Sequence, residues 1–110
     1  MPLHPLCRVE DIPSDEGRAF MVDGVRLALF RLDDGVHAID EICTHGDGSL
    51  ADGYVEGCEV ECPLHAGRFD IRTGCPMAEP VSIPVATYPV EIIDGIVHVC
   101  LEPRPLVQPA

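Results

Sequence analysis

Lysine and tryptophan are missing from this chain of 110 residues, and aromatic side chains are few. With three Phe and two Tyr, a hydrophobic core has to be built largely from Val, Ile and Leu. No apolar run approaches the ~20 residues of a membrane-spanning helix. The first residues contain neither the apolar stretch of a secretory signal nor a twin-arginine pair. We therefore expect a cytoplasmic protein with one domain over residues 1–110, because this length leaves no room for a second.

Positive charge is also scarce. Seven basic residues, all of them Arg, stand against 19 acidic ones, which gives a net charge of −12. Phosphate backbones and anionic membrane surfaces repel such a chain, so we expect neither a nucleic-acid nor a membrane partner. The acidity favours basic protein partners, although solubility alone explains it equally well.

Cysteine, by contrast, is abundant for a chain of this size, with six residues. In a small secreted protein they would suggest a disulfide framework, but the sequence has no secretory signal. Two of them fall in short motifs together with His, a pattern that indicates metal binding. The other four are expected to be small buried side chains: Cys7, Cys58, Cys75 and Cys100.

Asp-Gly turn signals and short β-type runs dominate the sequence. Segments 20–22 and 25–31, joined by Asp23-Gly24, predict a two-residue hairpin. In the second segment one face is strongly apolar, and the other, which includes Ala28 and Phe30, is mixed. Eleven Pro and the lack of a long helical period predict an all-β chain. Further strands are expected at 36–39, 58–61, 68–71, 88–92 and 96–101.

Two short motifs each combine one Cys with one His. The first is Cys43-Thr44-His45 and the second is Cys62-Pro63-Leu64-His65. A common structural zinc site pairs two Cys on one loop with two ligands further on, whereas here each loop offers one thiolate and one imidazole. Two Cys on one iron and two His on the other is the ligation of a Rieske [2Fe–2S] centre. A zinc-stabilised interaction module is the alternative.

The stretches CTHGDGSL, CPLHAGRFD and TGCP resemble Rieske-type ferredoxins, the electron-transfer components of bacterial aromatic-ring-hydroxylating dioxygenase systems. The resemblance runs from about Cys7 to Cys100. It implies the Rieske fold, in which an antiparallel β-sandwich or barrel base carries a small, loop-rich, cluster-binding subdomain. The base would span about 3–42 and 81–102, the subdomain about 43–80, and a loose tail 103–110.

The resemblance also implies one [2Fe–2S] cluster with four ligands: Cys43, His45, Cys62 and His65. No catalytic residue is expected, because an oxygenase also needs a mononuclear iron on two His and one carboxylate. Among the supporting positions, the Gly residues would let N–H groups approach sulfur, and the Pro residues would stiffen the second loop and form a third, covering loop. These positions are Gly46, Gly48, Pro63, Leu64, Gly67 and Pro76.

A low reduction potential is expected from the same comparison. High-potential members of the family carry Ser and Tyr hydroxyls at the positions of Gly67 and Phe69, and a loop disulfide at the positions of Gly48 and Leu64. Hydrogen bonds to the cluster sulfurs stabilise the more negative, reduced state. Since this chain lacks these groups, we expect a potential toward the ~−150 mV end of the Rieske range.

The resemblance implies a one-electron carrier and not an enzyme. It would pass electrons from an NAD(P)H-dependent flavoprotein reductase to a terminal oxygenase through the ring edges of His45 and His65. Acidic residues far outnumber Arg between Asp40 and Glu79, so basic docking sites on both partners are expected. The alternative within this family is the small Rieske-like subunit of an assimilatory nitrite reductase, which often lacks the ligands. The sequence does not specify the aromatic substrate, the reductase type or the oligomeric state.

Overall fold

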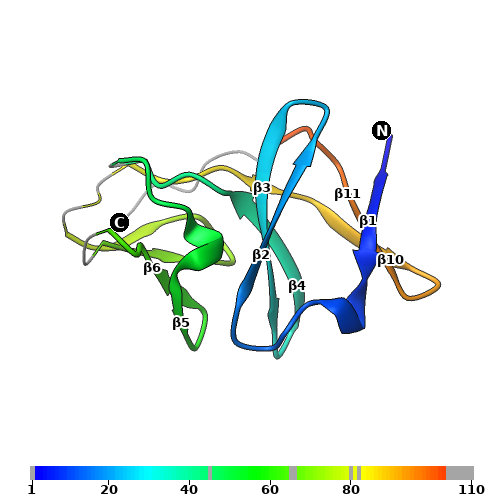
Figure 1. The fold of residues 1–110 in the computed structure, drawn as a ribbon, viewed down its shortest axis with the longest axis horizontal. Helices are drawn as coiled ribbons and strands as arrows, with labels where there is room; N and C mark the ends of the chain where they lie inside the picture. The colour runs from blue at the N-terminus through cyan, green and yellow to red at the C-terminus, as the bar shows by residue number, and fades with distance from the viewer. Residues whose placement is uncertain (1, 45, 65–66, 80, 82, 104–110) are drawn as a thin grey trace.

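Three antiparallel sheets lie in a row along a molecule that measures 39 × 26 × 25 Å (Figure 1). The computed structural model describes residues 2–44, 46–64, 67–79, 81 and 83–103. Within these ranges the helical elements are two short 3-10 turns, η1 (Val9–Asp11) and η2 (Leu50–Asp52). No helix in the described residues is long and apolar enough to cross a membrane. The all-β prediction is confirmed.

The middle sheet contains the predicted hairpin. Val22 pairs with Val25, and the two turn residues Asp23 and Gly24 have φ values of 48° and 81°. A two-residue turn of this kind needs positive φ at both positions, which Asp tolerates and Gly favours. The sheet has the order β2-β3-β4-β9, with β2 (Gly17–Val22), β3 (Val25–Leu32), β4 (Gly35–Asp40) and β9 (Thr87–Tyr88).

The outer sheet has the order β1-β11-β10, with β1 (His4–Arg8), β10 (Val90–Ile93) and β11 (Ile96–Val99). Asp94-Gly95 joins β10 to β11 through a second turn with positive φ at both residues. Strand β1 was not predicted, because a proline and a register shift interrupt its pattern between Pro5 and Cys7. Ile92 on β10 is 45% exposed.

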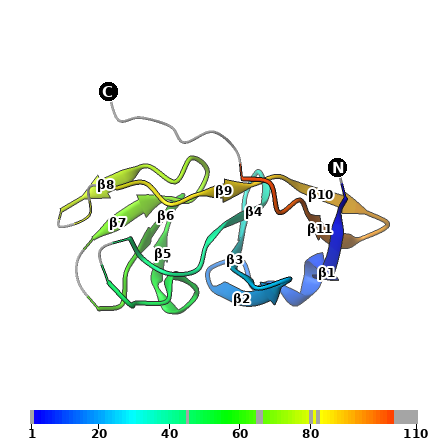
Figure 2. The ribbon, with the colours of Figure 1, turned by 90° about the horizontal axis from the view of Figure 1, so that it is seen from above.

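The small sheet lies at the opposite end of the molecule from β1 (Figure 2). Val55, Val60 and Phe69 face inward along it, while the intervening residues are acidic or basic except for the exposed Tyr54. Its order is β5-β6-β7-β8, with β5 (Tyr54–Glu56), β6 (Glu59–Glu61), β7 (Arg68–Asp70) and β8 (Pro76–Ala78). Strands β5 and β8 were not predicted, since neither continues an alternation of apolar and polar residues such as that of Cys58-Glu59-Val60-Glu61.

Strand β3 contributes to two separate hydrophobic cores. Leu27 and Leu29 pack in the core between the middle and outer sheets. Ala28 and Phe30 pack in the core between the middle and small sheets. The face of this strand that was expected to be mixed is therefore buried at its centre, because a third layer of structure covers it.

Asp40 joins the point where the chain leaves the middle sheet to the point where it returns. Its carboxylate accepts hydrogen bonds from Tyr88 Oη at 2.7 Å and from the Ala86 amide at 3.0 Å. The Asp40 amide donates to the Ala86 carbonyl at 3.0 Å. Burial, together with the bond to Asp40, raises the pKa of Tyr88 well above its ordinary value, so its hydroxyl remains a donor.

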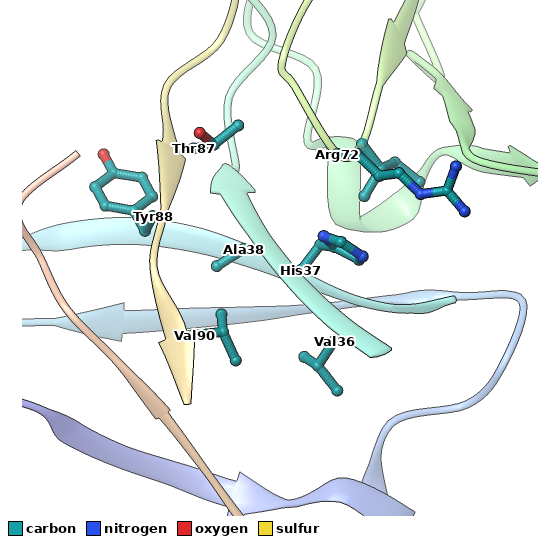
Figure 3. Close-up of a pocket in the computed structure, with 8 residues that line it drawn as sticks. Val36, His37, Ala38, Arg72, Thr87, Tyr88 and Val90 are labelled. Atoms are coloured by element: carbon teal, nitrogen blue, oxygen red, sulfur yellow. The ribbon is translucent and has the colours of Figure 1, made fainter. Parts of the chain in front are cut away.

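A second polar tie lies beside a small cavity of about 70 Å³ between β4, β9 and the segment after β7 (Figure 3). Arg72 Nε forms an ion pair with Asp34 Oδ2 at 2.9 Å, and His37 Nε2 lies 2.9 Å from Asp34 Oδ1. The hydrogen bond with His37 is the main cause that lowers the pKa of Asp34. The contact between Arg72 and Asp34 connects the small sheet to the β3–β4 turn.

Replacing Tyr88 with Phe should destabilise the protein by about 1.5–3 kcal/mol, the usual range for losing a hydrogen bond to a charged group. The expected readout is a lower urea midpoint of unfolding, followed by circular dichroism. Tyr54→Phe is the matched control, because Tyr54 is 60% exposed. Equal midpoints for the two variants would contradict the role given to the Tyr88–Asp40 bond.

Candidate metal centre

The first ligand loop, residues 43–48, is closed by backbone hydrogen bonds at its base. The Cys43 amide donates to the Gly48 carbonyl at 3.0 Å, and the Gly46 amide donates to the Cys43 carbonyl at 3.3 Å. Ile42 and Ser49 form a β-bridge directly outside the loop. Because β4 ends at Asp40, the middle sheet delivers the chain directly to Cys43.

The second ligand loop, residues 62–67, connects β6 to β7. Glu61 pairs with Arg68 at the last position of the ladder, and the Cys62 amide donates to the Gly67 carbonyl at 2.9 Å. Antiparallel pairing thus fixes both ends of this loop next to each other. The two loops have the same design, with a Cys at the first position held by a bond across the loop base.

Both motif cysteines are buried in one core. Cys43 is 3% exposed and Cys62 is 1% exposed, and both belong to the core between the middle and small sheets. A Cβ added at Gly48 would lie 2.5 Å from Cys62 Sγ and 3.2 Å from Leu64 Cγ. The first loop therefore lies directly against the second, and the Cys62 sulfur occupies the space that a side chain at Gly48 would need.

The two histidine predictions fall outside the described residues. His45 and His65 are the two residues concerned, and in the described part of the chain no group of three His, Cys, Asp or Glu is arranged to hold a metal ion. The buried thiols on two adjoining loops fit a metal cluster that takes one sulfur ligand from each loop.

The supporting residues have different surroundings. Gly46 has open space around it, whereas Gly48 is crowded, and neither has a positive φ. Gly48 is thus required for space and not for an unusual backbone conformation. Leu64 is 66% exposed beside the Cys62 sulfur, Pro63 is also exposed, and Gly67 is buried at the base of the second loop. Pro76, expected in a covering loop, begins β8 and pairs with Phe69.

A further contact was not anticipated from the sequence. Thr44 Oγ1, inside the first motif, donates to the Ile83 carbonyl at 2.7 Å. Ile83 is 60% exposed. The returning segment before β9 therefore lies against the first ligand loop. The signal in the sequence was the hydroxyl residue between the two ligand positions, but its partner lies far along the chain.

Carboxylates dominate the outward face of the small sheet. Glu56 lies opposite Glu59, which in turn lies opposite Asp70. Like charges directly across strands are unfavourable. Arg68 reduces the repulsion through Nη1, 3.1 Å from Glu56 and 3.6 Å from Glu59, and through Nε, 3.5 Å from Glu61. The hydrogen bond with Glu56 and the surrounding charges raise the pKa of Arg68.

One carboxylate lies inside, next to the first loop. Glu41 is 7% exposed and receives hydrogen bonds from Arg26 and Ser49. Burial opposes its ionisation, but the hydrogen bonds from Ser49 and Arg26 and the Arg26 charge outweigh it, so the pKa of Glu41 lies below its ordinary value.

The cysteines outside the motifs are less buried than expected. Cys100 is 1% exposed, as predicted, whereas Cys7, Cys58 and Cys75 are half-buried. Burial raises the pKa of the Cys7 thiol, and the nearby Asp11 charge adds to this effect.

Comparison with known proteins gives one consistent result. Residues 3–89 match the family model described as the Rieske [2Fe-2S] domain. The chain is 44% identical to the anthranilate 1,2-dioxygenase ferredoxin subunit of Burkholderia cepacia over 96 residues, which is 87% of this chain and 89% of that one. A Sphingomonas yanoikuyae B1 ferredoxin superposes with a TM-score of 0.85 at 40% identity, over 94% of this chain and 100% of the other.

Two more solved structures are relevant. One is a complex of reduced oxygenase and oxidized ferredoxin in carbazole 1,9a-dioxygenase, with a TM-score of 0.87, 33% identity and coverage of 94% and 96% of the two chains. The other is a putative NADH-dependent nitrite reductase small subunit from Mycobacterium tuberculosis, with a TM-score of 0.77, 28% identity and coverage of 96% and 97%. The identity is thus higher to the dioxygenase ferredoxins.

Replacing Gly48 with Ala should displace the Cys62 sulfur, because the added methyl would lie within 2.5 Å of it. Overpacking of this kind costs about 1–3 kcal/mol. We expect less bound iron and sulfide per chain after purification, measured by metal and acid-labile sulfide analysis. Gly46→Ala is the control, since its methyl would meet nothing within 4 Å. Full iron content in Gly48→Ala would contradict the packing argument.

Proposed function

Because the chain belongs to the Rieske [2Fe-2S] domain family, we propose that it is the ferredoxin component of a multicomponent aromatic-ring dioxygenase system. It carries one Rieske-type cluster and transfers electrons, and is not itself an enzyme. It takes electrons from an NAD(P)H-dependent flavoprotein reductase and passes them to the terminal oxygenase. The observation that carries the proposal is the burial of Cys43 and Cys62 in one core on two adjoining loops.

The proposed ligands are Cys43 and Cys62 on one iron, and His45 and His65 on the other. When bound, the cluster takes up and releases one electron. The chain excludes water from both thiolates, since each cysteine is almost fully buried. It leaves Leu64 exposed beside the Cys62 sulfur, so the ligand loops lie at the surface where a partner can approach.

The proposed cluster-binding unit, about residues 43–80, is the small sheet with its two ligand loops. The base is the middle and outer sheets, about 3–42 and 81–102. The ion pair of Asp34 with Arg72 joins the two parts, and the bond of Asp40 with Tyr88 joins, within the base, the strand that leads to the unit to the strand that follows it. We place the protein in the cytoplasm, where a reductase that oxidises NAD(P)H has its substrate.

The relatives support this function over the alternatives. Identity is 44% to a dioxygenase ferredoxin subunit and 28% to a nitrite reductase small subunit, and both Cys ligand positions are filled here. The family match likewise supports an iron–sulfur cluster over a zinc site.

The purified protein should be silent in electron paramagnetic resonance when oxidised. After dithionite it should give a signal with an average g below that of all-Cys clusters, since two imidazoles replace two thiolates.

The midpoint potential should be negative, toward ~−150 mV, because Gly67 and Phe69 offer no hydroxyl to the sulfurs. A colourless, silent protein that contains zinc would refute the proposal, and a potential well above zero would refute the argument from missing hydroxyls.

Electron transfer to the oxygenase should slow as ionic strength rises, because the acidic surface attracts a basic partner and salt screens it, with a Debye length of about 10 Å at 0.1 M. Asp47 is exposed in the first ligand loop, so Asp47→Asn should slow transfer a few-fold at low salt and converge with the native rate at high salt. Glu91→Gln is the matched control, because Glu91 is exposed on the outer sheet. The reduction potentials of both variants must equal that of the native protein, because a changed driving force would alter the rate by itself. Equal slowing by the two variants would show that only net charge matters.

A further inference from the structure

Glu41 is a buried carboxylate two residues before Cys43, and it joins strand β3 to the end of the first ligand loop. Its side chain is 9% exposed. Arg26 on β3 donates from Nε to Oε1 at 3.0 Å and from Nη2 to Oε2 at 3.3 Å. Ser49 Oγ donates to Oε2 at 2.7 Å. The carboxylate therefore has donors on both oxygens, from two different parts of the chain.

Ser49 is the residue that follows Gly48. The backbone already closes the loop around it, through the Ile42–Ser49 bridge and a bond of 2.6 Å from the Leu50 amide to the Glu41 carbonyl. These backbone bonds hold the two ends of the loop to each other. The Glu41 carboxylate adds a link of another kind, because it fixes the Ser49 end to Arg26 of the middle sheet.

The position of Gly48 decides where the Cys62 sulfur can lie, since the two are in direct contact. Burying a carboxylate is costly, and an ion pair of this kind is weak evidence for stability. The ion pair instead restricts the positions of the residues that it joins, because hydrogen bonds to a fixed carboxylate are directional and tolerate little displacement. Here the restricted residue is Ser49, which is next to Gly48 and so one residue from the contact between the two ligand loops.

We propose that Glu41 is a positioning residue for the cluster: held by Arg26, it fixes Ser49 and so sets how Gly48 packs against the Cys62 sulfur. The proposal rests on the ligand set given under the proposed function. Small changes in the geometry around a ligand sulfur alter both the reduction potential and the retention of the metal. The network therefore acts on the redox properties of the cluster and not only on folding.

The sharpest test is Ser49→Ala, which removes the link to the loop without changing any charge. We expect a shifted reduction potential, altered g values, and cluster loss to a chelator faster on the order of tenfold, as for one lost hydrogen bond to a charged acceptor. Ser49→Thr keeps the hydroxyl and should restore native values. Glu41→Gln alone does not separate positioning from charge, because the loss of a negative charge changes the reduction potential by itself.

Two comparisons separate positioning from simple destabilisation. Tyr88→Phe removes a different hydrogen bond to a carboxylate, that of Asp40, without changing any charge, and should leave the potential and the g values unchanged. Adding Ser49→Ala to Glu41→Gln should accelerate cluster loss no further, because both act through one link. Native potential, g values and chelator rate in Ser49→Ala would overturn this inference while the proposed function stands. If the native protein itself gave no Rieske signal, the proposed function would fail first.

Discussion

The burial of β3 on both faces is the constraint that holds the three layers in place. Leu27 and Leu29 serve one core, and Ala28 and Phe30 serve the other. A shift of one residue would exchange these two sets, so the register of this strand is strongly specified. The positive-φ turn at Asp23-Gly24 fixes the same register from the β2 side. Because β4 pairs along β3 and leads to Cys43, this register also positions the first ligand loop.

The two ligand loops depend on strand ends that are fixed independently. The first leaves the middle sheet after β4, and the second connects β6 to β7 in the small sheet. They meet where Gly48 lies against the Cys62 sulfur. Neither sheet alone could fix this contact. The ion pair of Asp34 with Arg72 joins the two parts of the chain, and both motif cysteines lie in one shared core, so the two loops are held in the same place relative to each other.

Several of the few arginines form ion pairs that join separate segments of the chain. Arg26, Arg68 and Arg72 each pair with a carboxylate on another segment. The planar guanidinium can serve two or three acceptors, which a Lys ammonium does less well. Acidic residues still outnumber basic ones by 19 to 7, so the protein as a whole remains strongly negative.

Local patterns in the sequence determined the all-β class, the hairpins at Asp23-Gly24 and Asp94-Gly95, and the two Cys-His motifs, because each depends on neighbouring residues or on turn chemistry. Strands β1, β5 and β8 were not predicted, since none of them shows an unbroken alternation of apolar and polar residues. Only the tertiary structure decided the burial of both faces of β3, the crowding at Gly48 and the link from Arg26 through Glu41 to Ser49. Each of these joins residues distant in the chain, and no local pattern records which partner folding will supply.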